Sequence, residues 1–284
     1  MHEHRDRFEV ALMCEILNVS RQGYYAWRRR RDRGPSPREV RRAELTAKIR
    51  VAHEQSRRTY GSPRVTVELK AAGERTCVNT VAKYMRAERI RVTPRRRFVP
   101  RTTDPDHPHP IAANVLDRSF AAAAPDRKWA ADLTYVATAE GWLYLSVVID
   151  LFSRKVVGWS MADDMRADGV ADALRMALAR RAPPPGLLHH SDRGAQYACT
   201  LYREILDGQR IESSMSRPGN CYDNACVESF FGTFKTELVH REHYRTRAEA
   251  RSSVFEWIEC WYNRRRRHSS LGYVSPEAFE AQTN

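Results

Sequence analysis

The stretch WAADLTYV, residues 129–136, carries Asp132 within a run of small, β-branched and aromatic residues, a composition typical of a β-strand. Two more acids lie in equally distinctive stretches, Asp192 in LLHHSDRGAQY and Glu228 in GNCYDNACVESFFGTFKTEL. Carboxylates that converge on one point repel each other unless cations neutralise them, and all-oxygen ligands favour hard cations such as Mg²⁺ or Mn²⁺. The three stretches therefore indicate a metal-assisted phosphoryl-transfer site, provided that the fold brings the acids together.

The residues between the first two acids predict an α/β core. GWLYLSVVIDLFSRKVVGWSM, residues 141–161, holds two apolar runs and predicts a β-hairpin. A helical pattern over 166–181 follows, and LLHHSD predicts a short buried strand that ends at Asp192. In open α/β sheets, ligand sites lie at the ends of strands. Asp150 falls inside the hairpin, where a structural carboxylate is a better interpretation than a ligand.

The third acid is predicted to lie on a helix. VESFFGTFKTEL has apolar residues at helical spacing, which brings Asn224, Glu228 and Lys235 near one another along one face. Asp223 precedes this helix and is expected to act as its N-cap or as a first-turn residue that favours the helix dipole. His190 is interpreted either as a proton shuttle beside the second acid or as a buried structural histidine.

The order of these elements resembles the ribonuclease-H-like fold of integrases and transposases. WxxDLTY, SVVIDLFSRKVVGW, HSDRGAQY, the Glu228 stretch and the tail WYNRRRRHSSLGYVSPEAF together resemble the second-frame (OrfB) product of the IS-three family of insertion-sequence transposases. CEILNVSRQGYYAW and YGSPRVTVELK are similar to the N-terminal part of that family, so the resemblance covers nearly the whole chain. The expected fold class is α/β, a ribonuclease-H-like core preceded by a small all-α helix-turn-helix region.

The resemblance implies a DDE-type transposase that cuts and transfers DNA strands at the ends of an insertion sequence. It implies that Asp132, Asp192 and Glu228 bind two Mg²⁺ or Mn²⁺ ions, with Asp132 bridging them. Lys235 would bind a phosphate. For Asn224, a contact with the site and a packing role are equally good interpretations. The implied partners are the terminal inverted repeats, target DNA, other copies of this chain on DNA, and the product of an upstream reading frame, usually as a fusion.

The positive charge of the chain is concentrated in its N-terminal part. The net charge is +13 overall, but residues 1–101 hold 26 Lys and Arg against 11 Asp and Glu. The remaining 22 Lys and Arg are outnumbered by 24 Asp and Glu. An excess of cations in one region is expected of a module that neutralises phosphates.

The chain divides into four predicted segments. Residues 1–35 form a helix-turn-helix-like segment, in which Ser20 caps the second helix and its aromatic residues are expected to pack rather than to stack on bases. A helical DNA-binding domain covers 36–92, with a long helix over 39–55 and a last helix capped by Asn79. A basic, Pro-rich linker covers 93–124, and the catalytic core with a helical tail covers 125–284.

The predicted DNA contacts are basic side chains from each segment. Besides Lys235 and Asn224, they are Arg28, Arg29, Arg30, Lys83, Arg86, Arg95, Arg96, Arg97, Arg265 and Arg266. The six cysteines lack the spacing of a zinc site or a disulfide framework. No membrane span or secretory signal is recognisable, which predicts a cytoplasmic, nucleoid-associated bacterial protein without membrane partners.

Two other functions remain open at this stage. A structure-directed nuclease of the same fold would hydrolyse DNA without strand transfer, but the motifs match transposases beyond the three acids. A DNA-binding repressor or a decayed transposase would lack activity altogether. The intact set of three acids argues against this second alternative.

Overall fold

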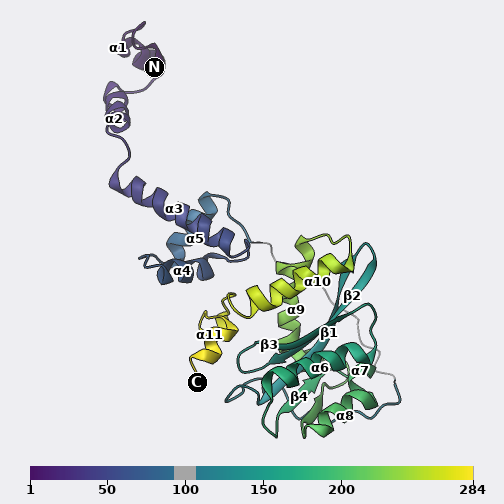
Figure 1. The fold of residues 1–284 in the computed structure, drawn as a ribbon. Coiled ribbons are helices and arrows are strands. Elements are labelled where there is room, and N and C mark those ends of the chain that lie inside the picture. The colour runs from purple at the N-terminus through teal and green to yellow at the C-terminus, as the bar shows by residue number, and fades with distance from the viewer. Residues whose placement is uncertain (93–106, 284) are drawn as a thin grey trace. The chain divides into compact units, whose positions relative to one another are not determined.

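The computed structural model describes residues 1–92 and 107–283 (Figure 1). The chain forms two compact units, Met1–Arg91 and Val92–Asn284. The finer four-segment division remains a prediction. Within the described ranges, no helix is both long enough and apolar enough to cross a membrane.

The first unit is entirely helical. Its helices are η1 (His2–His4), α1 (Val10–Ile16), α2 (Arg21–Asp32), α3 (Pro37–Gln55), α4 (Ser62–Ala71) and α5 (Val78–Ala87). The predicted turn between the first two α-helices is present, because Asn18 adopts a positive φ and the Ser20 hydroxyl accepts a hydrogen bond from the Gly23 N–H at 3.0 Å. Ser36 forms a capping box with Glu39 at the start of α3.

The helices α3, α4 and α5 pack around Ile49, Val65 and Val81, none of which is exposed. The start of the last helix differs from the prediction of an Asn79 cap. α5 begins at Val78, and its N-cap is Cys77, which has an extended backbone. The Cys77 Sγ lies 3.3 Å from the Thr80 hydroxyl, so a thiol and a hydroxyl three residues apart interact at this helix start.

The second unit contains a five-stranded mixed sheet in the order β3-β2-β1-β4-β5. The strands are β1 (Lys128–Thr138), β2 (Gly141–Asp150), β3 (Val156–Ala162), β4 (Leu188–Ser191) and β5 (Glu212–Met215). The predicted strand around Asp132, the hairpin and the strand before Asp192 are confirmed. The sequence analysis missed β5, because its sequence ESSM lacks an apolar pattern.

Part of one edge of β1 has no partner strand within the described ranges. β1 pairs with β2 along ten residues in antiparallel orientation, from Trp129 to Thr138. On its other side it pairs with β4 in parallel orientation, but only over Lys128–Ala130. Among the described residues, no strand pairs with 131–137 on that side. This uncovered edge is where the third acid approaches.

Helices cover both faces of the sheet (Figure 1). They are α6 (Ala167–Arg181), α7 (Ala195–Ala198), α8 (Thr200–Gly208), η2 (Cys221–Asn224), α9 (Ala225–Glu237), η3 (Val239–Arg241), α10 (Arg247–Glu256), η4 (Trp257–Tyr262), η5 (Ser269–Leu271) and α11 (Pro276–Ala281). α6, α7 and α8 pack their apolar residues against Trp129, Ala131 and Val148. α9 and η4 form an aromatic cluster in which Phe230 lies 4.8 Å from Tyr262 and 5.8 Å from Trp257, between ring centroids.

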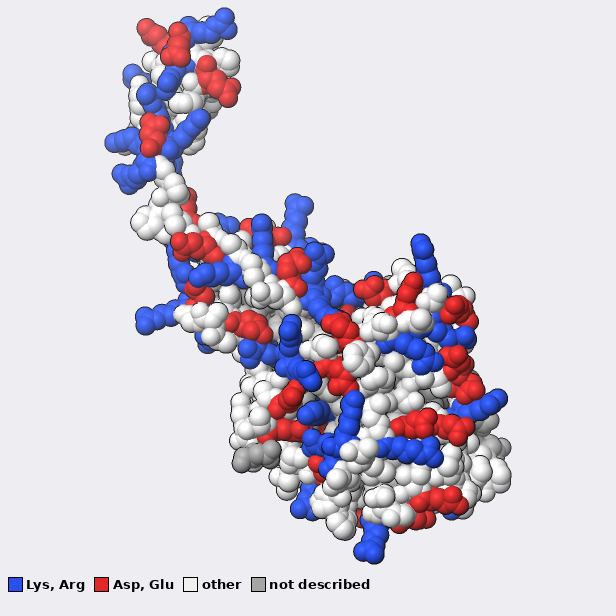
Figure 2. All heavy atoms as spheres, viewed as in Figure 1, with Lys and Arg blue, Asp and Glu red and all other residues white. Residues whose placement is uncertain are grey.

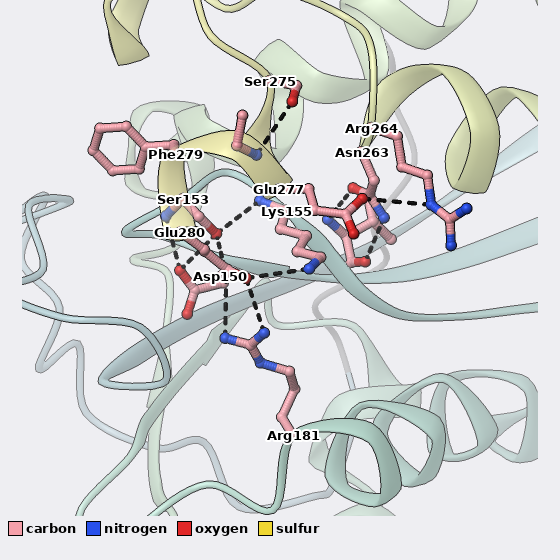
Figure 3. Close-up of polar contacts among 12 residues, drawn as sticks. Asp150, Ser153, Lys155, Arg181, Asn263, Arg264, Ser275, Glu277, Phe279 and Glu280 are labelled. Atoms are coloured by element: carbon pink, nitrogen blue, oxygen red, sulfur yellow. Dashed lines mark hydrogen bonds and ion pairs between the residues drawn. The ribbon is translucent and has the colours of Figure 1, made fainter. Parts of the chain in front are cut away.

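A polar cluster joins the C-terminal segment to the core (Figure 3). Glu280 on α11 accepts hydrogen bonds from the Ser153 hydroxyl at 2.8 Å and from the Arg181 guanidinium at 3.0 and 3.1 Å. Arg181 also pairs with Asp126 at 2.8 Å. Asp150 accepts backbone N–H groups of Asp126, Phe152 and Ser153, so it is a structural carboxylate of the hairpin, in line with the preferred sequence interpretation.

The described part of the expected linker packs against the core. Leu116 is fully buried, and the backbone N–H groups of Val115 and Leu116 donate to the Ser214 hydroxyl on β5 at 3.0 and 3.1 Å. The Ser214 hydroxyl thereby joins this segment to β5, the last strand of the sheet. Residues 112–118 consequently belong to the second unit rather than to an extended connection.

Candidate active site

Asp132 lies on β1, and Asp192 directly follows the end of the adjacent strand β4. The last pair between β1 and β4 is Ala130 with His190, and each acid lies two residues beyond its paired residue. Asp132 accepts the Leu133 N–H at 2.7 Å, and Asp192 accepts the Gly194 N–H at 2.9 Å. The expectation that these two acids approach on neighbouring strands is met.

Two contacts fix the position of α9 along the uncovered edge of β1. At its start, the Asn224 side-chain amide donates to the Ala131 carbonyl at 3.2 Å. Near its end, the Lys235 ammonium lies 4.6 Å from the Tyr135 ring centroid. The eleven helical steps from Asn224 to Lys235 span about 16 Å, and the four strand steps from Ala131 to Tyr135 span about 13 Å. α9 therefore follows the edge of β1, and Glu228, four residues into this interval, is level with the part of the strand that carries Asp132.

The electrostatics of the site reflect crowded negative charge. Burial raises the pKa of Asp132 well above its usual range, and the charges of Asp192 and Glu228 raise it further. The Leu133 N–H and the Lys235 charge oppose this increase. Burial also raises the pKa of Glu228. Asp132 therefore lies where burial and neighbouring negative charge disfavour its ionised form.

The three acids fit a hard divalent cation in their chemistry. All their ligand atoms are carboxylate oxygens, and their mutual repulsion is the penalty that a cation removes. However, within residues 1–92 and 107–283 no three His, Cys, Asp or Glu side chains are gathered closely enough to hold a metal ion. The expectation that all three acids lie close enough is thus not met in this structure. Glu228 is exposed, which agrees with unrelieved repulsion keeping it away from the two aspartates.

Lys235 lies over the first of two neighbouring aromatic rings, Tyr135 and Trp142. Burial lowers the pKa of this lysine, while the charge of Asp132 acts in the opposite direction. The Tyr135 ring beneath it lies 4.7 Å from the Trp142 ring, in an edge-to-face arrangement between β1 and β2. Trp142 is 49% exposed. The sequence analysis missed both aromatic residues, although Tyr135 stands only three positions after Asp132.

The residues around Asp192 divide into structural and unsatisfied groups. His190 is buried, and its two ring nitrogens lie 2.9 Å from the Ser214 hydroxyl and 3.1 Å from the Ser216 hydroxyl. Burial lowers its pKa to about 4. It is therefore the structural histidine of the two sequence interpretations. Tyr197, which the sequence analysis also missed, is buried, and its hydroxyl has no hydrogen-bond partner within the described part of the chain.

The predicted DNA contacts occupy varied environments. Arg29, Arg30, Lys83 and Arg86 are exposed on α2 and α5, and Arg28 is partly exposed beside Asp32. Figure 2 shows many Lys and Arg side chains projecting from the first unit. Arg95, Arg96 and Arg97 lie outside the described residues. Arg265 is exposed, whereas Arg266 is 4% exposed and its guanidinium is paired with Glu237 at 2.8 Å. A buried, paired guanidinium is not available to a phosphate, so we do not retain Arg266 as a DNA contact.

Comparisons with known proteins extend over the whole chain. Residues 122–221 and 209–276 match two family models described as integrase core domain, and residues 40–98 match an HTH-like domain. The integrase-core matches confirm the predicted α/β fold class. Transposase InsF for insertion sequence IS3A of Escherichia coli (strain K12) is 45% identical over 280 residues, which cover 99% of this chain and 96% of that protein.

Two further similarities were found. A 31 kDa protein of insertion element IS600 from Shigella sonnei is 44% identical over 267 residues, covering 94% of this chain and 97% of that protein. Among solved structures, the HTLV-2 integrase catalytic core domain in complex with magnesium covers 56% of this chain and 98% of that chain. It is 17% identical, with a TM-score of 0.42.

Proposed function

The chain belongs to the IS3 family of insertion-sequence transposases, and we propose that Asp132, Asp192 and Glu228 are the residues with which it cuts and joins DNA strands. Its function is DNA transposition, carried out by an integrase-type polynucleotidyl transferase core. The alternatives of a nuclease without strand transfer and of a DNA-binding repressor are not favoured. The assignment of the three acids as a DDE site is the proposal.

The observation that carries this proposal is the shared electrostatic environment of the acids. Burial and the charge of Asp192 both raise the pKa of Asp132, and Glu228 adds to the effect. A carboxyl whose pKa is raised by burial and by two further acids is a candidate functional site, because its ionised form is unfavourable until a cation is bound. The three carboxylates would hold Mg²⁺ or Mn²⁺, in the proposed case two ions.

Bound metal would activate the attacking hydroxyl and stabilise the leaving 3′-oxygen in an in-line displacement at phosphorus. The residues of the chain prepare this step. β1 and β4 hold Asp132 and Asp192 at fixed positions, and α9 brings Glu228 along the edge of β1. Lys235, beside Tyr135, carries a positive charge toward the strand that is cut, where it would hold a phosphate.

The test is a strand-cleavage and strand-transfer assay on labelled insertion-sequence ends, with Mg²⁺ and with a chelator. The wild-type chain should give both cleaved and joined products only with the metal. Cleavage without joining would favour the nuclease alternative. Sequence-specific binding without cleavage, in a chain whose Mn²⁺ binding is intact, would favour the repressor.

We propose that the first unit supplies the main DNA-binding surface. The exposed Lys83 and Arg86 lie one turn apart on α5, in the region that matches an HTH-like domain. Changing each to Ala in the full chain should reduce the steepness of the salt dependence by about one phosphate contact per residue. The matched control is Arg50→Ala, because Arg50 is an exposed arginine of the same unit that pairs with Glu88. An equal effect of the control would contradict the assignment.

The finer partners stay proposals of the same kind. They are the terminal inverted repeats and target DNA as the two substrates, other copies of this chain on DNA, and the product of an upstream reading frame as a fusion. The mass of the complex that the chain forms with DNA carrying one or two insertion-sequence ends gives the number of copies bound. Comparison with a fused product tests the contribution of the upstream frame.

A further inference from the structure

The start of α9 differs from an ordinary helix start. Its N-cap residue is Asn224, a residue type whose side chain normally accepts a hydrogen bond from the first turn of the helix. Here the side chain makes no such bond. The amide instead points to β1 and donates to the Ala131 carbonyl, the group next to Asp132. Asn224 is also the last residue of η2, which runs directly into α9 and is capped by the Asn220 side chain through the Tyr222 N–H. The Asn224 side chain is therefore not needed as a cap and contacts the strand that carries the first acid.

The orientation of this amide is determined by its partner. Only the NH₂ half of the amide can donate to a carbonyl, so the Oδ1 atom must face the other way. Asn224 is 5% exposed, and its Oδ1 has no hydrogen-bond partner within the described residues. Buried polar atoms are nearly always paired, and an exception requires an explanation. Here the NH₂ group is held by the Ala131 carbonyl, and this orientation leaves the Oδ1 atom without a hydrogen bond among the described residues.

The preceding residue fixes Asn224 in place. The fully buried Asp223 carboxylate accepts hydrogen bonds from Arg217 at 2.7 and 2.8 Å, from Arg118 at 2.9 Å and from Asn114 at 2.8 Å. It also accepts the Arg217 backbone N–H at 2.9 Å. These donors come from the loop after β5 and from the segment before β1. The first residue of the pair therefore holds the helix start to the core, and the second holds it to β1.

We propose that Asn224 is a positioning residue that sets the separation of Asp132 and Glu228, with Asp223 as its anchor. The inference rests on the proposed function of the two acids. Glu228 lies one helical turn after Asn224, so a shift of the helix start moves its carboxylate by a similar amount. Partners that orient metal ligands typically change metal affinity by about 10- to 100-fold when removed.

The test compares Asn224→Ala with a matched control, Asn263→Ala. Asn263 is also buried and joins a helical segment to a strand, through 2.9 Å bonds to the Val156 N–H and carbonyl on β3. Both variants lose a buried helix-to-strand amide, but only the first borders the acids. Mn²⁺ binding to the DNA-free full-length chain is measured by electron paramagnetic resonance of the free ion. Thermal unfolding and amide hydrogen exchange over 225–230 are measured in parallel.

We expect Asn224→Ala to weaken Mn²⁺ binding about tenfold and Asn263→Ala to change it less than twofold, at similar losses of thermal stability. Exchange over 225–230 should accelerate only in the first variant, and this measurement decides the question if the DNA-free chain binds too little Mn²⁺ to quantify. Equal effects of the two variants on both measurements would overturn the proposal and leave Asn224 as an ordinary packing residue.

A second variant keeps the test decisive if Asn224→Ala folds poorly. Asn224→Asp retains the size of the side chain but places a carboxylate oxygen against the Ala131 carbonyl. Added negative charge by itself would tighten a cation site, so weaker Mn²⁺ binding would point to a displaced Glu228. Tighter binding would contradict the positioning role. Because no DNA is present, wild-type Mn²⁺ binding together with an absence of strand cleavage would defeat the proposed function and not this inference.

Discussion

The second unit contains two groups of three carboxylates, and they have opposite environments. Asp126, Asp150 and Glu280 are met by Arg181, Lys155, the Ser153 hydroxyl and backbone N–H groups (Figure 3). In the group of Asp132, Asp192 and Glu228, burial and the charges of the other two acids raise the pKa of Asp132. The first group stabilises the fold by joining the C-terminal segment to the core. We propose that the second group is the functional one, because a bound cation would favour the ionised form of Asp132.

The comparison predicts that the two groups fail in different ways. Changing Asp132, Asp192 or Glu228 singly to Ala should reduce strand cleavage by more than about 100-fold, beyond the usual cost of losing a supporting partner. DNA affinity measured without metal should change little. Cleavage assays and salt-matched binding assays check the two halves of this prediction. Two variants with substantial remaining activity would remove the distinction between the groups.

Substitutions in the group of Asp126, Asp150 and Glu280 should lower the free energy of unfolding. Glu280→Ala removes the carboxylate that Lys155 and the Ser153 hydroxyl contact and leaves Arg181 with Asp126 alone, so we expect a loss of about 2–4 kcal/mol in the free energy of unfolding. Urea unfolding measures this value. Glu277→Ala is the matched control on the same helix, because Glu277 pairs with Arg264 at 3.4 Å on the surface. The control should cost less than about 1 kcal/mol.

Metal binding should stabilise the fold through the group of Asp132, Asp192 and Glu228. Mg²⁺ binds the folded chain and not the unfolded one, so ten times the dissociation constant should raise the free energy of unfolding by about 1.4 kcal/mol. Asp132→Asn relieves repulsion and should be at least as stable as wild type in a chelator, yet gain nothing from Mg²⁺. Thermal unfolding with and without the ion checks both statements. A normal gain by this variant would place the metal elsewhere.

The contribution of Glu280 to the free energy of unfolding should depend on pH. Burial alone would raise the pKa of this carboxyl, but hydrogen bonds from Ser153 and the Arg181 charge hold it below its usual value of 4.5. A lowered pKa in the folded state contributes stability above pH 4.5 that is lost as the pH falls below this value. The stability difference between wild type and Glu280→Gln should therefore be largest near neutral pH and shrink in acid. A difference that grows in acid would contradict the role of this carboxylate.

Local patterns predicted the elements of the site, while long-range contacts decided its geometry. The strand of Asp132, the strand before Asp192 and the helix of Glu228 each follow from residue spacing, because periodicity is a local property. β5 was not predicted because its buried residue Ser214 is polar and contacts His190 and the backbone of residues 115–116 through hydrogen bonds. The burial of Arg266 depends on Glu237, 29 residues earlier in the chain, which no local pattern reveals.

The three acids illustrate the same limit. Their selection came from motifs that resemble a family, and their adjacency came from the sheet order. The distance that Glu228 keeps from the aspartates depends on a balance between repulsion and the contacts at the start of α9. That balance involves Asp223, Arg217 and Asn224, whose contacts could not be read from the sequence.

The short pairing of β4 has a consequence for incomplete copies of this protein. Among the described residues, no strand pairs with 131–137 of β1 on the side of β4, and α9 covers this edge instead, with Asn224 bonded to the Ala131 carbonyl. Exposed strand edges are templates for pairing with other chains. A copy that is cut short before Ala225 would therefore expose this edge and self-associate into insoluble material. Truncated products of this kind would be cleared rather than persist as soluble competitors for DNA.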